Sequence, residues 1–229
     1  MNNEETIKAL QQLLKDAGYY TGAVDGDWGP NSKKAHQALL DHIEKGNVTM
    51  STLDIAWSAK VSPEFVAEVK KLVVELGMTY PDAASDLMCC MAFETGETFS
   101  PSVKSPVSSA TGLIQFMDAT AKEMGTTTAA LAKMSAEEQL RVYVRKYFMK
   151  YKGKLKNLGD IYMAILWPAG IGKPDDHVLW DTATRPKQYL ANKGLDIDKD
   201  GDITRSECLK KINEKKVRGM DISRRRPLM

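Results

Sequence analysis

The chain has 229 residues, of which 43% are hydrophobic and 27% charged, and this is the composition of an ordinary globular protein. Its formal net charge of +2 is too small to indicate a nucleic-acid partner. The longest weakly polar run, residues 162–172, is too short to span a bilayer and contains Pro168. The length allows one large domain, or a small domain followed by a larger one.

The cysteines and the first residues bear on where the protein is made. Cys89, Cys90 and Cys208 do not form a disulfide framework, and the first two are adjacent in an apolar segment, where a free cysteine behaves as a small hydrophobe. We therefore expect folding in a reducing compartment. The first ten residues are acidic and lack a long apolar run, so we expect no signal peptide and a cytoplasmic product.

Residues 4–45 are predicted to form a small helical unit. Apolar residues recur there at helical spacing, at Ile7, Leu10, Leu13 and Leu14. Gly18 is a predicted helix end, and residues 19–32 are dense in Gly, Asp and Pro, which indicates consecutive tight turns. Asn31 or Ser32 is a predicted cap for a second helix.

The amino-acid sequence of this turn matches the pattern of a known family. Residues 10–39 resemble the peptidoglycan-binding repeat of bacterial and phage wall hydrolases, and the matching elements are Leu10-Gln11, Leu13-Leu14, Gly18-Tyr19-Tyr20, Gly22, Val24-Asp25-Gly26 and Trp28-Gly29-Pro30. The resemblance implies a three-helix module over residues 1–48 that docks on peptidoglycan through Tyr19, Tyr20, Asp25 and Trp28. Alternatively, the aromatic residues only form a small core; both roles can hold together.

Residues 49–61 show little periodicity and are predicted to be a linker. A helix start signal follows at Ser62-Pro63-Glu64, with a serine cap, a proline in the first turn and an acidic residue. Strongly helical patterns follow, at residues 65–77, 83–93, 129–151 with a break near Ser135, and 158–167. No alternating strand pattern is convincing, so the fold class is predicted to be all-α, with a larger, mostly α domain over residues 62–229.

The apolar segment 87–93 ends on Glu94. A carboxylate at the mouth of an apolar helix end has its charged form disfavoured, so its pKa is expected to rise and it can serve as a general acid. The alternative is that the helix has simply reached the surface and Glu94 is solvated. Glu97 would share this face only if the helix continued, and Gly96 argues against that.

The residues around Glu94 resemble the superfamily of goose-type lysozymes and soluble lytic transglycosylases. The matching elements are Glu94-Thr95, Pro101, Ser108-Ser109, Gly112-Leu113-Ile114-Gln115, Thr120-Ala121 and the helix at 138–147. Trp167-Pro168 stands where this superfamily usually has Tyr-Asn. The resemblance is closest to modular endolysins of phages that infect Gram-negative bacteria.

This resemblance implies that Glu94 alone serves as acid and then base in cleaving the β-1,4 bond between N-acetylmuramic acid and N-acetylglucosamine. No cofactor is required for this chemistry. Gln115 is the substrate contact that the resemblance implies, through the family's Gly-Leu-Met-Gln motif. Further candidates for contact with the sugar are Ser109, Tyr147, Tyr162, Trp167 and His177. For the tyrosines and Trp167 the alternative is core packing, and for His177 simple exposure. The expected product is a monomeric endolysin that leaves the host cytoplasm through a holin-type pore and lyses the cell from the periplasm.

Two alternative functions remain open. The same scaffold could be a lytic transglycosylase that forms 1,6-anhydro products, used by the virion during infection. A rival of another class is a wall-binding or calcium-binding scaffold without catalysis.

Residues 196–207 fit the helix-loop-helix calcium loop without a gap. The predicted oxygen ligands of a structural Ca²⁺ are Asp196, Asp198, Asp200, Asp202 and Glu207. Gly201 takes the position of the sharp turn and Thr204 that of a water-mediated contact. After this loop comes a basic tail, residues 210–229, which is predicted either to be solvated and partly disordered or to touch an anionic bacterial envelope.

Overall fold

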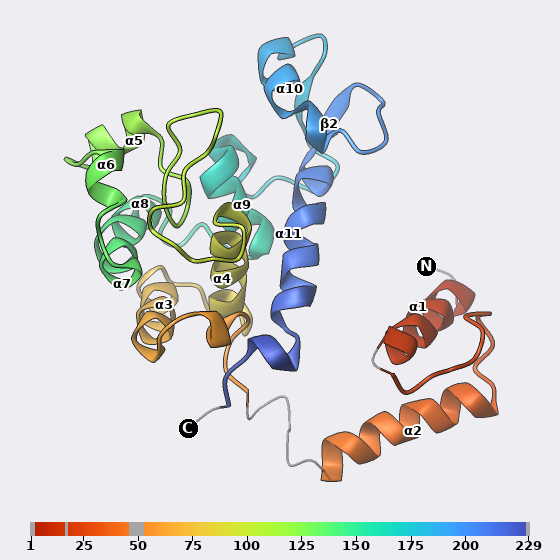
Figure 1. The fold of residues 1–229 in the computed structure, drawn as a ribbon. Helices are drawn as coiled ribbons and strands as arrows, with labels where there is room; N and C mark the ends of the chain where they lie inside the picture. Colours follow the sequence, from red (N-terminus) through yellow and green to blue (C-terminus); the bar gives the residue numbers. More distant parts are fainter. Residues whose placement is uncertain (1–2, 17, 46–52, 228–229) are drawn as a thin grey trace. The chain divides into compact units, whose positions relative to one another are not determined.

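The computed structural model describes residues 3–16, 18–45 and 53–227. The chain divides into two units, a small unit of Met1–Leu53 with Pro227–Met229 and a large unit of Asp54–Arg226. Both are built from helices, and the described residues contain a single two-stranded sheet (Figure 1), so the predicted mostly α fold class is confirmed. Among the described residues, no helix combines the length and the apolar character needed to cross a membrane.

The small unit contains helices α1 (Asn3–Asp16) and α2 (Pro30–Lys45), joined by the predicted turn segment. The third helix of the expected bundle does not lie among the described residues. A buried glutamine, Gln11, organises the turn: its amide nitrogen donates to Asp25 Oδ1 at 2.8 Å and Ser32 Oγ at 3.0 Å, and its oxygen accepts from the Gly26 amide at 2.9 Å. Of the predicted apolar stripe, Leu14 is buried but Leu10 and Leu13 are exposed, so the buried face of α1 is partly polar.

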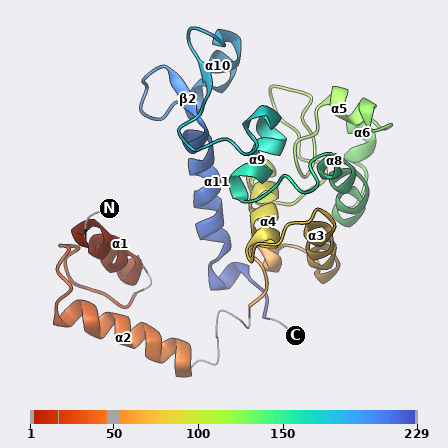
Figure 2. The same cartoon turned by 180° about the vertical axis from the view of Figure 1, so that it is seen from behind.

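Helix α4 (Ala83–Glu94) is the central element of the large unit. Every residue from Ala83 to Ala92 is buried, as expected for a helix that is apolar on all sides. It packs against α3 (Pro63–Glu75), α9 (Leu158–Leu166) and α11 (Arg205–Gly219), which lie around it in both views (Figures 1 and 2). Helix α4 therefore passes through the core, and only its last residues, Phe93 and Glu94, are partly exposed.

The remaining elements of the large unit are short: η2 (Ser58–Lys60), α5 (Asp118–Glu123), α6 (Thr128–Leu131), α7 (Ala136–Gln139), the π-helical η3 (Leu140–Val144), α8 (Arg145–Met149), η4 (Pro168–Gly170), β1 (Val178–Asp181), α10 (Pro186–Asn192), η5 (Lys193–Leu195), β2 (Asp202–Thr204) and η6 (Ile222–Arg224). The predicted start at Ser62 and the predicted break near Ser135 are both confirmed. Each serine caps a helix, accepting a hydrogen bond from a backbone N–H three residues on. The antiparallel pair β1 and β2 was not predicted.

The end of the predicted linker proves to be part of the large unit. Trp57 is fully buried, takes a left-handed backbone conformation with φ of 64°, and donates from its indole nitrogen to the carbonyl of Lys215 at 3.1 Å. A side chain at Gly219 would begin only 2.1 Å from that nitrogen, so glycine is required where α11 crosses the indole. Residues from Asp54 onward are thus core structure and not linker.

The predicted basic tail is mostly helix α11 and the short η6. Its last residues return to the start of the unit: the Asp54 amide donates to the carbonyl of Arg226 at 2.7 Å, and the Arg226 amide donates to Ser58 Oγ at 2.9 Å. Arg224 lies over the Trp57 ring, with its guanidinium carbon 4.8 Å from the ring centroid. The tail is therefore structured up to Arg226, and several of its cations have partners inside the unit.

Candidate functional site

Glu94 occupies the last turn of α4. The helix ends at once after it: the Thr95 amide donates to the carbonyl of Met91 at 3.0 Å, and the Glu97 amide donates to that of Ala92 at 2.7 Å. Gly96 has a φ of 59°, the left-handed conformation that commonly ends helices. The sequence Glu-Thr-Gly therefore places the carboxyl where the buried helix meets the surface.

The surroundings of Glu94 disfavour its charge. The side chain is largely buried, and burial raises its pKa to about 7. Neither a hydrogen bond nor an ion pair to its carboxyl is found within the described residues. Phe93 beside it packs edge-to-face against the buried Tyr162 ring, with centroids 5.7 Å apart. Because burial raises its pKa toward neutral pH, Glu94 keeps a protonated fraction there and can donate a proton.

Glu97, three residues further on, is in the opposite situation. Its carboxylate forms ion pairs with Arg218 at 2.9 Å, with Arg224 at 3.6 Å and with Lys215. Burial by itself would raise the pKa of Glu97, but the hydrogen bond from Lys215 and the charges of Lys215 and the two arginines lower it below its ordinary value. Glu97 thus ties α11 and η6 to the end of α4 and is a poor candidate for a second acid.

Gln115 and Ser109 shape the loop that follows Glu94. Gln115 has a φ of 53°, and its amide nitrogen donates to the carbonyls of Gly112 at 3.0 Å and Val103 at 3.3 Å. Ser109 Oγ accepts from the backbone N–H of Asp118 at 3.1 Å. Both predicted sugar contacts therefore hold the loop in place, and their role toward a substrate stays a prediction.

The sequence did not predict the role of Gln139, a residue that holds this loop through hydrogen bonds of its side-chain amide. It is fully buried, its oxygen accepts from the Leu113 amide at 2.7 Å, and its nitrogen donates to the carbonyls of Leu131 at 2.9 Å and Pro101 at 3.1 Å. Gly112 lies against this amide with a φ of 86°, where a Cβ would come within 2.4 Å. A buried glutamine in a helical pattern carries no signal that reveals these partners.

The other predicted cleft residues fall into two groups. Tyr147 and Tyr162 lie near Glu94. Burial is the largest cause that raises the pKa of both phenols; the next largest is Tyr151 for Tyr147 and the charge of Glu94 for Tyr162. Tyr147 also donates to the carbonyl of Ala164 at 2.6 Å. Trp167 packs edge-to-face on the buried Trp180 at 5.5 Å, and His177 meets α11, its carbonyl accepting from the Arg205 amide at 2.9 Å.

The four predicted wall-binding residues also fall into two groups. Asp25 is part of the turn, since it accepts from Gln11 and from the Asp27 amide, and Trp28 packs edge-to-face on His36 at 5.8 Å. The two tyrosines instead meet at a pocket of about 490 Å³. Its lining residues are Tyr19, Tyr20, Thr21, Gly22, Asn31, Lys34, Ala35 and Ala38.

Three of the five predicted calcium ligands converge. Asp196, Asp198 and Glu207 each offer an oxygen within 4.8 Å of the other two, whereas Asp200 and Asp202 lie outside this group. Glu207 is also the third residue of a capping box with Thr204 at the start of α11, and its Oε1 accepts from the Ile197 amide at 2.9 Å. The role of Thr204 is thus that of a helix cap.

One carboxylate oxygen of this loop is buried without a well-formed hydrogen bond. Asp196 Oδ2 accepts from the Tyr189 hydroxyl at 2.6 Å, whereas Oδ1 has no partner at normal hydrogen-bond geometry. The hydrogen bond from Tyr189 and the nearby backbone N–H groups of Lys199, Asp200 and Gly201 lower the pKa of this carboxyl. Gly201 has a φ of 94°, as the sharp turn of a calcium loop requires, and β2 pairs the loop with β1. Three converging carboxylates, one of them with a buried and poorly hydrogen-bonded oxygen, form a donor set that a divalent cation would satisfy.

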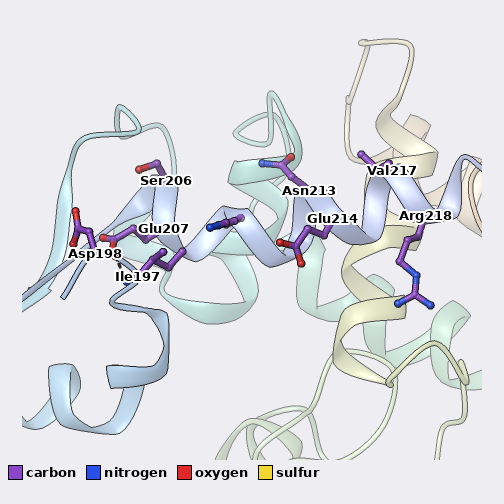
Figure 3. A pocket seen from close by; sticks show the side chains of 9 residues that line it. Ile197, Asp198, Ser206, Glu207, Asn213, Glu214, Val217 and Arg218 are labelled. Carbon is purple, nitrogen blue, oxygen red and sulfur yellow. Dashed lines mark hydrogen bonds between the residues drawn. The ribbon is translucent and has the colours of Figure 1, made fainter. Parts of the chain in front are cut away.

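An open pocket of about 900 Å³ extends from this loop along α11. Figure 3 shows Asp198, Ser206 and Glu207 at one end of it and Val217 and Arg218 at the other. Glu94 is not among the residues that line this pocket, and none of the lining residues was predicted to be catalytic.

The described geometry thus includes a helical unit in which burial raises the pKa of Glu94, and a small turn-linked unit with a pocket lined in part by two tyrosines. Residues 3–35 match the family model of the putative peptidoglycan binding domain. The match covers α1, the turn and the first part of α2, and it supports a cell-wall-binding module with peptidoglycan as its partner. The comparison with curated proteins gives no match.

Proposed function

We propose that the large unit is a glycosidase that cleaves the β-1,4 bond between N-acetylmuramic acid and N-acetylglucosamine in peptidoglycan. The observation that carries this proposal is Glu94, a largely buried carboxyl with a pKa of about 7 and no described partner, at the exposed end of a buried helix. A general acid works best when its pKa lies near the working pH.

In this mechanism Glu94 donates its proton to the oxygen of the leaving sugar. Many glycosidases use a second carboxylate, but Glu97 is neutralised by three cations and has no such role here. The N-acetyl group of the substrate supplies the internal nucleophile instead. Glu94, now ionised, then takes a proton from the attacking group, which is water in a muramidase or the sugar's own 6-hydroxyl in a lytic transglycosylase.

The family match in the small unit supports this choice of substrate. A module that binds peptidoglycan raises the local concentration of any enzyme linked to it. A phage endolysin that reaches the wall from the host cytoplasm is the biological role we propose, and this last step rests on the resemblance of the sequence alone.

Mass spectrometry of the muropeptides released from purified peptidoglycan tests the proposal. We expect the parent chain to release products and Glu94→Gln to release almost none, while Glu214→Gln, a change at an exposed glutamate of α11, behaves as the parent does. A reducing muramic end would identify a muramidase, and products lighter by one water would identify a lytic transglycosylase. No release by the parent chain would leave only the non-catalytic wall-binding scaffold.

We further propose that Asp196, Asp198 and Glu207 hold a structural Ca²⁺. The observation that favours this is the convergence of the three carboxylates within 4.8 Å, together with the buried and poorly hydrogen-bonded Oδ1 of Asp196. A bound cation would offset the repulsion between the carboxylates of the loop and play no part in bond cleavage. Calorimetry should show uptake of Ca²⁺ by the parent and by Asp176→Asn, an exposed control, but not by Asp198→Asn. No uptake by the parent at millimolar Ca²⁺ would refute the site.

A further inference from the structure

The pocket of the small unit lies between two segments of the chain, and one of them is held in place by hydrogen bonds. One wall comes from the turn after α1, including Tyr19 and Thr21, and the other from the first half of α2, including Asn31 and Lys34. Two small residues of α2, the buried Ala35 and the exposed Ala38, also line it. The turn wall is fixed, because the Tyr19 and Tyr20 amides both donate to the carbonyl of Leu14, at 2.9 and 3.1 Å.

Gly22 explains how the turn wall keeps its shape. A Cβ at this position would come within 2.6 Å of the Tyr20 hydroxyl, so only glycine lets the ring lie flat against the turn. Tyr20 is buried, and its hydroxyl donates to the carbonyl of Ala23 at 2.8 Å. The ring is therefore held as a wall and is not an open face on which a sugar can stack.

The charge of the pocket has one sign. Lys34 is its one ionisable lining residue besides the tyrosines, and none of the lining residues is acidic. Lys15 adds a second cation at the rim, since its ammonium donates to the carbonyl of Gly22 at 3.1 Å. The side chains of Asn31 and Thr21 add a neutral amide and a hydroxyl. A cation with neutral hydrogen-bonding neighbours favours a carboxylate ligand.

Peptidoglycan offers carboxylates in only one of its two parts. Its glycan strand carries hydroxyl and N-acetyl groups and is neutral where the lactyl groups are joined to peptides, whereas the peptide stems carry free carboxylates. We propose that the pocket binds a carboxylate of the peptide stem, with Lys34 as the charged contact. This inference rests on the wall-binding role of the small unit and is independent of Glu94.

Isothermal calorimetry on the full chain tests the inference with three soluble probes: a stem tetrapeptide with free carboxylates, the same peptide with its carboxylates amidated, and neutral di-N-acetylchitobiose. We expect the free peptide to bind about tenfold more tightly than the amidated one, the size of one charge-assisted hydrogen bond. The disaccharide should not compete with it. None of these readouts involves cleavage, so a failure of the glycosidase proposal leaves the result unaffected.

Variants on α2 locate the site. Lys34→Gln should weaken binding of the free peptide about tenfold and abolish its preference over the amidated peptide, whereas Lys34→Arg should retain both. Lys33→Gln removes the neighbouring, exposed lysine that does not line the pocket and should leave binding unchanged. Ala38→Leu fills the pocket without changing its charge and should also weaken binding.

The inference is overturned if the free peptide does not bind, if the disaccharide binds in competition with it, or if Lys34→Gln and Lys33→Gln have equal effects.

Discussion

The end of α4 and the turn that follows it carry the same side chain in opposite electrostatic settings. Glu94 has no described ion pair, and burial raises its pKa to about 7. Glu97 lies beside Lys215, Arg218 and Arg224, and its pKa is lowered. The difference arises because Gly96 turns the chain, so that the second carboxylate faces α11 and η6. Two glutamates three residues apart thus have different roles: Glu97 stabilises the fold, and Glu94 is the proposed proton donor.

The largest expected effect is on activity. Glu94→Gln should lower the rate of peptidoglycan cleavage by about 10²–10⁴, the usual contribution of a general acid. Glu97→Gln should stay within a few-fold of the parent, measured as release of soluble muropeptides at a temperature where both variants are folded. Equal losses in the two variants would mean that the glutamates do not have separate duties.

The pH profile of the parent sharpens the same contrast. Glu94 must be protonated to act, so kcat/KM should fall about tenfold per pH unit above its pKa of about 7, or about 100-fold by pH 9. In Glu97→Gln this limb should keep its midpoint. An initial-rate series across neutral and alkaline pH decides this, and a midpoint that moves in Glu97→Gln would show that Glu97 sets the acidity of Glu94.

Stability should depend on pH with opposite signs at the two positions. A raised pKa in the folded state makes the parent lose stability as pH rises from about 4.5 to 7, so Glu94→Gln should be more stable than the parent by about 2–3 kcal/mol at pH 8 and nearly equal at pH 4.

Glu97 has a lowered pKa, so its contribution is present above about pH 4.5 and disappears as pH falls below that value. Glu97→Gln should therefore be less stable than the parent by roughly 1–3 kcal/mol at neutral pH. Urea unfolding of the parent and both variants across this range measures the two trends, and trends of equal sign would contradict this assignment.

The smallest expected effect is at Arg218, the most exposed of the three partners of Glu97. Arg218→Gln should cost only about 0.2–1 kcal/mol in unfolding free energy, and added salt should reduce the difference because exposed charges are screened. Lys215→Gln should cost more, since Lys215 is better buried. The same urea experiment at low and high salt compares them, and an equal, salt-independent cost would show that the contacts act through packing.

Local signals in the sequence predicted much of this arrangement. Helix starts and ends depend on neighbours within a few residues, so they can be predicted from the local sequence. Examples are the cap at Ser62, the break at Ser135 and the helix end at Glu94. The calcium-type loop is similarly local, although only three of its five predicted ligands converge.

The features that were missed depend on distant partners. Trp57 contacts Lys215, which lies 158 residues away, and nothing in the sequence around Trp57 indicates this. For the same reason a basic segment was expected to be a solvated tail, when several of its cations are ion-paired to Glu97 and to Asp86 on α4. The strands β1 and β2 have four and three residues, too few for an alternating pattern to show.

The hydrogen bond between the Asp54 amide and the carbonyl of Arg226 brings the two ends of the large unit together. Domains whose ends meet tolerate insertion into other proteins and circular permutation, because the chain enters and leaves at one place. The large unit should therefore be transferable as a cassette into a surface loop of another protein. It should also tolerate a covalent join of its ends with new termini opened elsewhere. Truncation before Arg226, by contrast, removes the acceptor of this hydrogen bond and should be poorly tolerated.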